Sequence, residues 1–143
     1  MNPITRTTTR TSTRIAGTVL AGLTLLSAGP AARAAAPAEL LAGYTAQAGA
    51  PAQAMRGQQF FTTTHGREWS CASCHGATPT QGGKHASTGK PIAAMAPAFN
   101  PERFSDPAKT EKWFRRNCND VVGRECSTAE KADVLAWLMT LKP

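Results

Sequence analysis

Apolar residues recur at helical spacing near the C-terminal end of the chain. They are Val134, Trp137, Leu138 and Leu141, at positions i, i+3, i+4 and i+7. This spacing places them on one face of a helix. Ser127 and Glu130 have the pattern of a capping box, which predicts that the helix begins after Ser127 and runs to residue 141. Lys131 and Asp133 fall outside the apolar face, so we expect both side chains to point to water.

A second helix is predicted over residues 54–62. Gly57 and Phe61 share one face of this helix at i, i+4 spacing, and Phe60 broadens that face. A glycine inside a helix costs about 1 kcal/mol relative to alanine. A close crossing with the helix that carries Trp137 would explain why a glycine stands here, and we expect that crossing.

Two further helices complete the predicted all-α fold. One begins at Asp106, a capping residue, with Pro107 in the first helical position, and runs to Asn117. The other covers residues 38–47. No segment alternates apolar and polar residues as a strand does. Residues 76–104, rich in Gly and Pro, are expected to form a loop, and so long a loop in a small domain indicates that it surrounds a group that is not protein.

The first 34 residues have the layout of a secretory signal peptide. The basic residues at its start are Arg6, Arg10 and Arg14. An apolar run over residues 15–26 and a stretch of small residues follow them. The run is shorter than the ~20 residues that a membrane-spanning helix needs. We therefore expect cleavage after Ala34 and export of residues 35–143, as one domain, to the periplasm.

The net charge changes once the predicted signal peptide is set apart. The chain of 143 residues has 16 Lys+Arg and 9 Asp+Glu, a net charge of +7. Four of the arginines and none of the acidic residues lie in the first 34 positions, which leaves a net charge of +3. So small a charge, with no aromatic residues among the basic ones, argues against nucleic-acid binding. We expect no stable insertion into a membrane either.

Cys71, Cys74 and His75 form a C-x-x-C-H motif. This spacing is the signature of c-type haem attachment, in which each thiol bonds one vinyl group of the porphyrin and the histidine becomes the proximal iron ligand. A redox-active dithiol is one alternative, but it would be expected in a βαβ context. A zinc site is another, for which His65 and His85 are poorly spaced. The motif therefore predicts one covalently bound haem c.

The other two cysteines are Cys118 and Cys126. Because the haem consumes Cys71 and Cys74, only one disulfide pairing is left, and an oxidising compartment allows it. Closing so small a loop contributes up to ~2.5 kcal/mol to stability. The expected role of this disulfide is to hold the start of the last helix against the preceding helix.

Spacing alone leaves the sixth iron ligand open. Met95, in the Pro-rich loop, ranks first, because ordinary electron-carrying c cytochromes use methionine on the distal face. His85 ranks second and an open site third. Met139 lies on the apolar side of the last predicted helix, so it is expected to fill space in the core.

Short stretches spread over nearly all of the chain after the signal peptide match one known family. They include residues 56–57 (RG), 60–61 (FF), 70–76 (SCASCHG), 88–93 (TGKPIA), 96–97 (AP), 103–104 (RF), 111–113 (EKW), 116–119 (RNCN), 122–124 (VGR), 126 (C), 130–133 (EKAD) and 135–138 (LAWL). In these stretches the chain resembles the sphaeroides haem protein (SHP) family of class I c-type cytochromes. The resemblance implies an all-α class I cytochrome c fold, a single domain wrapped around one haem.

The resemblance also implies a different distal ligand. In this family the ligand is an asparagine directly before a cysteine, which here is Asn117 before Cys118, and the disulfide to Cys126 lies close to the haem. Met95 is then not a ligand, and Asn119 is expected to be a turn residue. The family further implies that the ligand is released on reduction, so that ferrous iron can bind O2, NO or CO, and that a dihaem cytochrome c supplies the electrons.

Basic residues cluster in sequence around Asn117. They are Lys109, Lys112, Arg115, Arg116 and Arg124. They are expected to form either a docking face for an acidic redox partner or an ordinary solvated surface. The function we expect is periplasmic electron transfer with diatomic binding at the reduced iron. The alternatives are a terminal reductase of oxygen or another small oxidant, an ordinary His/Met electron carrier using Met95, and a diatomic sensor that needs a partner.

Overall fold

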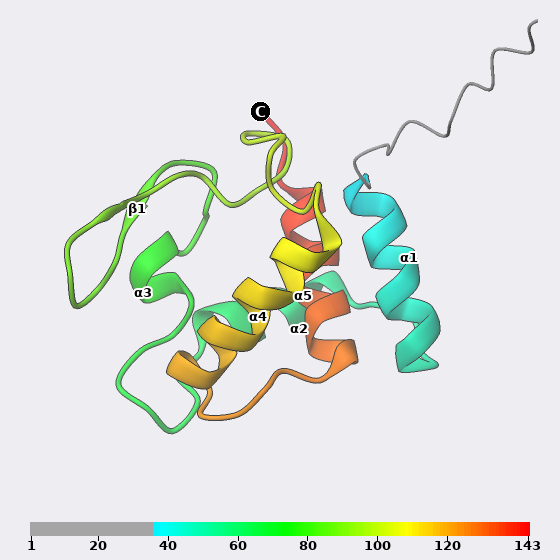
Figure 1. Ribbon diagram of the computed structural model, residues 1–143, viewed down its shortest axis with the longest axis horizontal. Coiled ribbons are helices and arrows are strands. Elements are labelled where there is room, and N and C mark those ends of the chain that lie inside the picture. The colour runs from blue at the N-terminus through cyan, green and yellow to red at the C-terminus, as the bar shows by residue number, and fades with distance from the viewer. Residues whose placement is uncertain (1–35) are drawn as a thin grey trace, which may run out of the picture. The chain divides into compact units, whose positions relative to one another are not determined.

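The computed structural model describes residues 36–143, so the predicted signal peptide lies outside the described residues. The elements are α1 (Pro37–Ala48), α2 (Ala54–Thr62), α3 (Ala72–His75), β1 (Gly83–Lys84), β2 (Pro91–Ile92), α4 (Pro107–Val121) and α5 (Thr128–Thr140) (Figure 1). The four longer helices are the ones that the hydrophobic pattern predicts. None of the helices described over residues 36–143 has the length and apolar character needed to cross a membrane.

Helix α5 lies at the centre of the core. The Ser127 hydroxyl accepts a hydrogen bond from the Glu130 amide at 3.2 Å, and the Glu130 carboxylate accepts one from the Ser127 amide at 2.7 Å, which confirms the capping box. Val134, Trp137 and Leu138 are buried against Phe61 of α2. The apolar face that the spacing predicts is therefore the face that forms the core.

Helices α2 and α5 cross with their backbones in contact. A Cβ atom placed on Gly57 would overlap the carbonyl oxygen of Asp133 and lie 2.7 Å from the amide nitrogen of Val134. One turn later, the rings of Phe61 and Trp137 pack with their centroids 5.0 Å apart. The predicted crossing is confirmed, and glycine is required there because any side chain would separate the two helices.

The expectation that Lys131 and Asp133 point to water is wrong. Asp133 is only 2% exposed, and its carboxylate accepts hydrogen bonds from the Arg56 guanidinium and from the Gln53 amide, the latter at 2.7 Å. Lys131 is half-buried and donates to Glu111 at 2.7 Å. Asp133 lies on the face of α5 that α2 covers, and a buried carboxylate is tolerated there because a cation and a backbone amide compensate its charge.

Helix α4 starts as predicted but ends later. The Asp106 carboxylate caps it by accepting from the Lys109 amide at 3.0 Å. The helix was expected to end at Asn117, yet it continues to Val121 because no helix-breaking residue stands before Gly123, which has a φ of 79°. Cys118 therefore lies within the helix.

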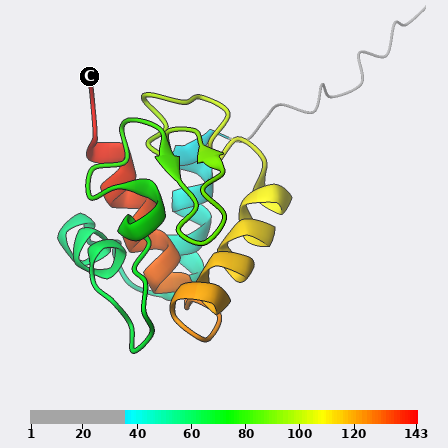
Figure 2. The ribbon, with the colours of Figure 1, turned by 90° about the vertical axis from the view of Figure 1, so that its left-hand side faces the viewer.

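A short hairpin interrupts the predicted loop over residues 76–104. Strands β1 and β2 pair antiparallel, with Gly83 opposite Ile92 and Lys84 opposite Pro91. The prediction of no strand is corrected here, because two-residue strands are too short to show an alternating pattern. The ribbons of α3 and α4 lie apart in both views, with the hairpin beside α3 (Figures 1 and 2).

Candidate haem site

Helix α3 places the three residues of the C-x-x-C-H motif. Cys71 precedes the helix, and its carbonyl oxygen accepts hydrogen bonds from the amides of Cys74 and His75 at 3.3 and 3.1 Å. Residues three positions apart in a helix lie on the same side, so the two thiols face one region. Both cysteines are free and half-buried. The turn thus presents two thiols and an imidazole together, as covalent haem attachment requires.

The imidazole of His75 is held in its neutral form. Burial and, to a smaller extent, the positive charge of Arg103 lower the pKa of His75 to about 4. Its ring lies 6.1 Å from that of Phe61, measured between centroids. A neutral imidazole keeps a lone pair on nitrogen at neutral pH, which is the form that binds a metal.

The surroundings of the motif disfavour both alternative chemistries. Burial raises the pKa of the Cys71 thiol to about 11, whereas a redox-active C-x-x-C pair needs a lowered thiol pKa. The Nε2 atom of His65 donates to the Phe60 carbonyl at 2.7 Å, and its ring packs against the Phe60 ring. In residues 36–143 no cluster of three or more metal-ligating side chains occurs, so a zinc site has no support.

An apolar surface adjoins the motif. Cys71 and Met95 both pack against the core cluster around Phe61 and Trp137. The Met95 amide donates to the carbonyl of the fully buried Pro79 at 3.0 Å, which fixes this part of the loop. Met95 is therefore half-buried and in contact with the core.

The hairpin packs against the C-terminal end of α3. A Cβ atom on Gly83 would overlap the carbonyl oxygen of Cys74, so only glycine allows this approach. The Ala86 amide donates to the Cys74 sulfur at 3.2 Å. The Nδ1 atom of His85 accepts hydrogen bonds from Ser87 within its own turn. His85, the second candidate ligand from spacing, thus has one ring nitrogen occupied by local structure.

Helix α4 carries Asn117, the ligand that the family resemblance implies. Its side chain is half-buried, and among the side-chain hydrogen bonds of residues 36–143 none involves its amide. Asn119 differs, because it is exposed and donates to the Arg115 carbonyl at 2.8 Å. Asn119 lies inside α4, so the expectation that it forms a turn is wrong. Of the two asparagines, only Asn117 combines partial burial with a free amide.

A disulfide follows Asn117 directly. Cys118 is joined to Cys126, with Cα atoms 5.6 Å apart, and both are buried. The bond ties the last turns of α4 to the segment before α5. It therefore restrains the backbone beside Asn117.

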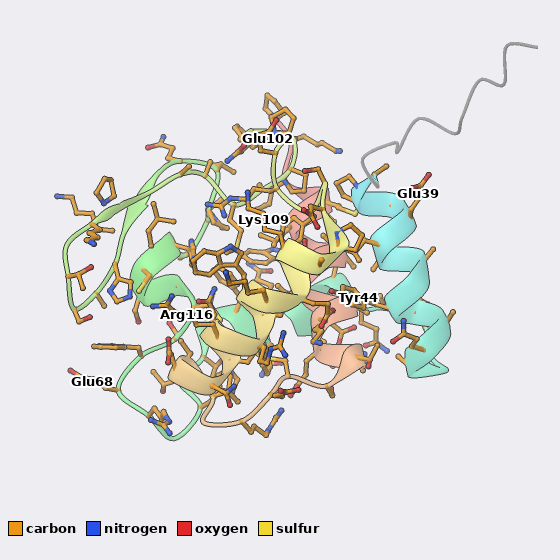
Figure 3. The ribbon with its side chains drawn as sticks, in the orientation of Figure 1. Glu39, Tyr44, Glu68, Glu102, Lys109 and Arg116 are labelled. Atoms are coloured by element: carbon orange, nitrogen blue, oxygen red, sulfur yellow. A yellow bond between two sulfur atoms is a disulfide. The ribbon has the colours of Figure 1, made fainter. Side chains whose placement is uncertain are left out.

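A polar network holds the middle of α4, and sequence reasoning missed it. The Tyr44 hydroxyl donates to Glu111 at 2.5 Å, and Lys131 donates to the other carboxylate oxygen at 2.7 Å. Tyr44 is labelled in Figure 3. Burial alone would raise the pKa of Glu111, but the hydrogen bonds from Lys131 and Tyr44 together hold it below its usual value. Phe114 adds an edge-to-face contact with Tyr44 at 6.1 Å between centroids.

The residues of the site fit a haem c. Two free thiols, a neutral half-buried imidazole and an apolar wall come together on one side, and a half-buried amide stands on α4. A haem c requires a pair of attachment points, an axial nitrogen donor and a surface for a large apolar ring, and the groups gathered here are of those kinds.

Solved structures of two proteins resemble this fold. The structure of oxidized SHP, described as an oxygen-binding cytochrome c, aligns with a TM-score of 0.69 and 52% identity, covering 73% of this chain and 96% of that chain. Oxidized cytochrome c'' from Methylophilus methylotrophus aligns with a TM-score of 0.67 and 37% identity, covering 75% of this chain and 95% of that chain. The fold and the site together define a class I c-type cytochrome.

Sequence relatives identify the family. The cytochrome c-type protein SHP of Cereibacter sphaeroides is 53% identical over 121 residues, covering 81% of this chain and 93% of the relative. Cytochrome c'' of Methylophilus methylotrophus is 46% identical over 80 residues, 56% of each chain. The family described as Domain of unknown function (DUF1924) matches residues 47–138. The chain belongs to the SHP family of c-type cytochromes, and its cofactor is a covalently attached haem c.

Proposed function

We propose that this chain is a periplasmic electron-transfer protein whose distal ligand leaves the iron on reduction. Cys71 and Cys74 form the thioether bonds, His75 is the proximal ligand and Asn117 is the distal ligand. The observation that carries the proposal is the half-buried Asn117 amide, which lacks a hydrogen bond within residues 36–143 and directly precedes the disulfide. The relative described as an oxygen-binding cytochrome c supports a ligand-binding function.

The chemistry of an amide explains why such a ligand leaves. When bound, the haem supplies a one-electron couple and an axial position for a diatomic ligand. The Asn117 amide oxygen is a hard, weak donor that suits ferric iron better than the softer ferrous iron. Once free, the same side chain offers its N–H group as a hydrogen-bond donor to O2, NO or CO. A methionine ligand would remain bound in both oxidation states.

The anchoring of α4 supports a small movement of the Asn117 side chain over a movement of the helix. Glu111 and Phe114 hold the helix on the N-terminal side of Asn117, and the Cys118 disulfide holds it on the other side. With the backbone restrained at both positions, the amide can leave by a change of rotamer. The disulfide thereby positions the ligand, so that the amide stays near the iron after release.

The exposed side of α4 supports an acidic redox partner such as a dihaem cytochrome c. Lys109, Lys112, Arg115 and Arg116 are all exposed (Lys109 and Arg116 are labelled in Figure 3). Arg124, the fifth member of the cluster expected from sequence, is paired with Glu130 at 2.7 Å and is therefore partly neutralised. The four remaining cations lie on the helix that carries Asn117, so a partner bound there would dock close to the distal side.

Absorption spectra of the purified protein test the ligand assignment. We expect a five-coordinate high-spin ferrous spectrum that shifts promptly when CO is added. Replacing Asn117 with Ala should change the ferric spectrum. It should also speed the binding of added ligands to the ferric protein, because the competing amide donor is gone. Asn119→Ala is the matched control, since it removes an exposed amide on the same helix and should leave both unchanged.

Two results would contradict the proposal. One is a ferric spectrum that is the same in Asn117→Ala and in the wild type. The other is a sharp low-spin ferrous spectrum with no response to CO. The second would mean that Met95 or His85 holds the iron and that the protein is an ordinary electron carrier.

A further inference from the structure

Arg103 holds the segment after β2 in place. Its Nε donates to the Ala94 carbonyl and its Nη2 to the Ala93 carbonyl, each at 2.9 Å. The Asn100 amide adds a third hydrogen bond, to the Ala94 carbonyl at 3.1 Å. These bonds use two of the five guanidinium N–H donors and leave the Nη1 edge free.

The charge of Arg103 has no protein counter-ion in the described part of the chain. The ion pairs found in residues 36–143 are Arg56–Asp133, Arg124–Glu130 and Lys131–Glu111. Arg103 is half-buried, and burial lowers its pKa. A partly buried cation without an anion is costly, so a cation in this position implies an anion that the protein itself does not supply.

Arg103 also lies beside the apolar surface that adjoins the motif. Met95 packs with Cys71 against the core cluster around Phe61 and Trp137, and Arg103 donates to the Ala94 carbonyl directly before Met95. The next residue, Phe104, has a φ of 60° and packs against Phe114 with centroids 6.3 Å apart. A phenylalanine in this left-handed conformation is strained, and such strain persists where the surrounding structure holds the backbone in one arrangement.

We infer that Arg103 binds a carboxylate of the haem, one of its two propionates. The planar guanidinium suits a carboxylate, and the free Nη1 edge supplies the donors. The propionate would be the missing counter-ion, and the two backbone carbonyls would hold the guanidinium in position to receive it. This inference depends on the haem c of the family and not on Asn117 as the distal ligand.

Reduction potential and resonance Raman spectra of the holoprotein test the inference. Removing a cation beside the haem favours the ferric form. Arg103→Gln should therefore shift the ratio of reduced to oxidised protein at a fixed potential by at least about threefold toward oxidised, which is ~28 mV for a one-electron couple. The propionate bending frequency should shift as well. Arg103→Lys should keep the potential, because it keeps the charge.

Arg115→Gln is the matched control, because it removes the same charge from an exposed position on α4. If Arg103→Gln lowers stability but matches Arg115→Gln in potential and propionate frequency, then Arg103 only clamps the loop and the inference is overturned. CO binding measured on the same samples reports separately on Asn117.

A measurement on the wild type covers the case in which Arg103→Gln does not fold. We expect nuclear Overhauser effects between the Arg103 guanidinium protons and the propionate methylene protons in the reduced, CO-treated protein. If CO does not bind, the reduced protein is low-spin and serves equally well. Their absence at both propionates would overturn the inference.

Discussion

Replacing Gly57 with Ala should destabilise the protein, although alanine is the better helix former. Gly57 lies in the middle of α2, where this helix crosses α5. A methyl group there would overlap the Asp133 carbonyl oxygen and lie 2.7 Å from the Val134 amide nitrogen. Both neighbours are backbone atoms of a helix, so neither can move aside by rotating a side chain. The two helices would have to separate.

Two opposing contributions determine the size of the effect. Alanine favours the helical state by ~1 kcal/mol relative to glycine. Overpacking of a core costs ~1–3 kcal/mol, and a clash with the backbone of the facing helix α5 belongs at the upper end of that range. The net loss in the free energy of unfolding should therefore be ~2 kcal/mol, or about a 30-fold change in the folding equilibrium constant.

Urea unfolding of the holoprotein, followed by far-UV circular dichroism, measures this change. Gly43→Ala is the matched control, because Gly43 lies in α1 and a Cβ atom there would meet nothing within 4 Å. That variant should gain up to ~1 kcal/mol. The two substitutions are chemically identical and should have opposite signs. If Gly57→Ala unfolds at the same urea concentration as the wild type or at a higher one, the backbone contact between α2 and α5 is wrong.

Three further predictions concern the helix ends and α4. Replacing Cys118 and Cys126 together with Ser should lower the free energy of unfolding by up to ~2.5 kcal/mol in urea titrations, and an unchanged midpoint would exclude a stabilising disulfide. Ser127→Ala should cost ~1 kcal/mol through loss of the α5 cap, visible as a lower melting temperature, whereas equal melting would contradict the capping role. Glu111 has a pKa held below its usual value in the folded state, so it stabilises the fold above about pH 4.3 and this contribution is lost as the pH falls through the folded-state pKa. Glu111→Gln should flatten the fall in stability below about pH 4.3, and a profile as steep as that of the wild type would refute the network.

Features that depend on neighbouring positions were predictable. The apolar stripe and the cap of α5 involve residues within a few positions of each other, and both are confirmed. The C-x-x-C-H motif was also predictable, because two thiols that bond one porphyrin must lie close together in the chain. The crossing at Gly57 could be anticipated because an unfavourable glycine in a helix calls for an explanation in packing.

Features that depend on residues far apart in the chain could not be predicted in this way. The exposed position expected for Asp133 was wrong because its compensating cation, Arg56, stands 77 positions earlier in the chain. Its spacing to Trp137, one helical turn, was a signal that Asp133 belongs to the buried face.

Two errors have local causes. The hairpin was missed because strands of two residues leave no periodic pattern. The end of α4 was placed too early, although no helix-breaking residue stops the helix at Asn117.

The sequence by itself determined the helices, the attachment motif and, through the family resemblance, the haem class of the protein. Only the tertiary structure decided which charges are buried and which groups meet. Tyr44 reaches Glu111 across 67 positions, and Arg56 reaches Asp133 across 77 positions. The physical reason is that the energy of a buried charge depends on its partner in space, and a one-dimensional pattern specifies spacing along a helix but not the partner that the fold brings to it.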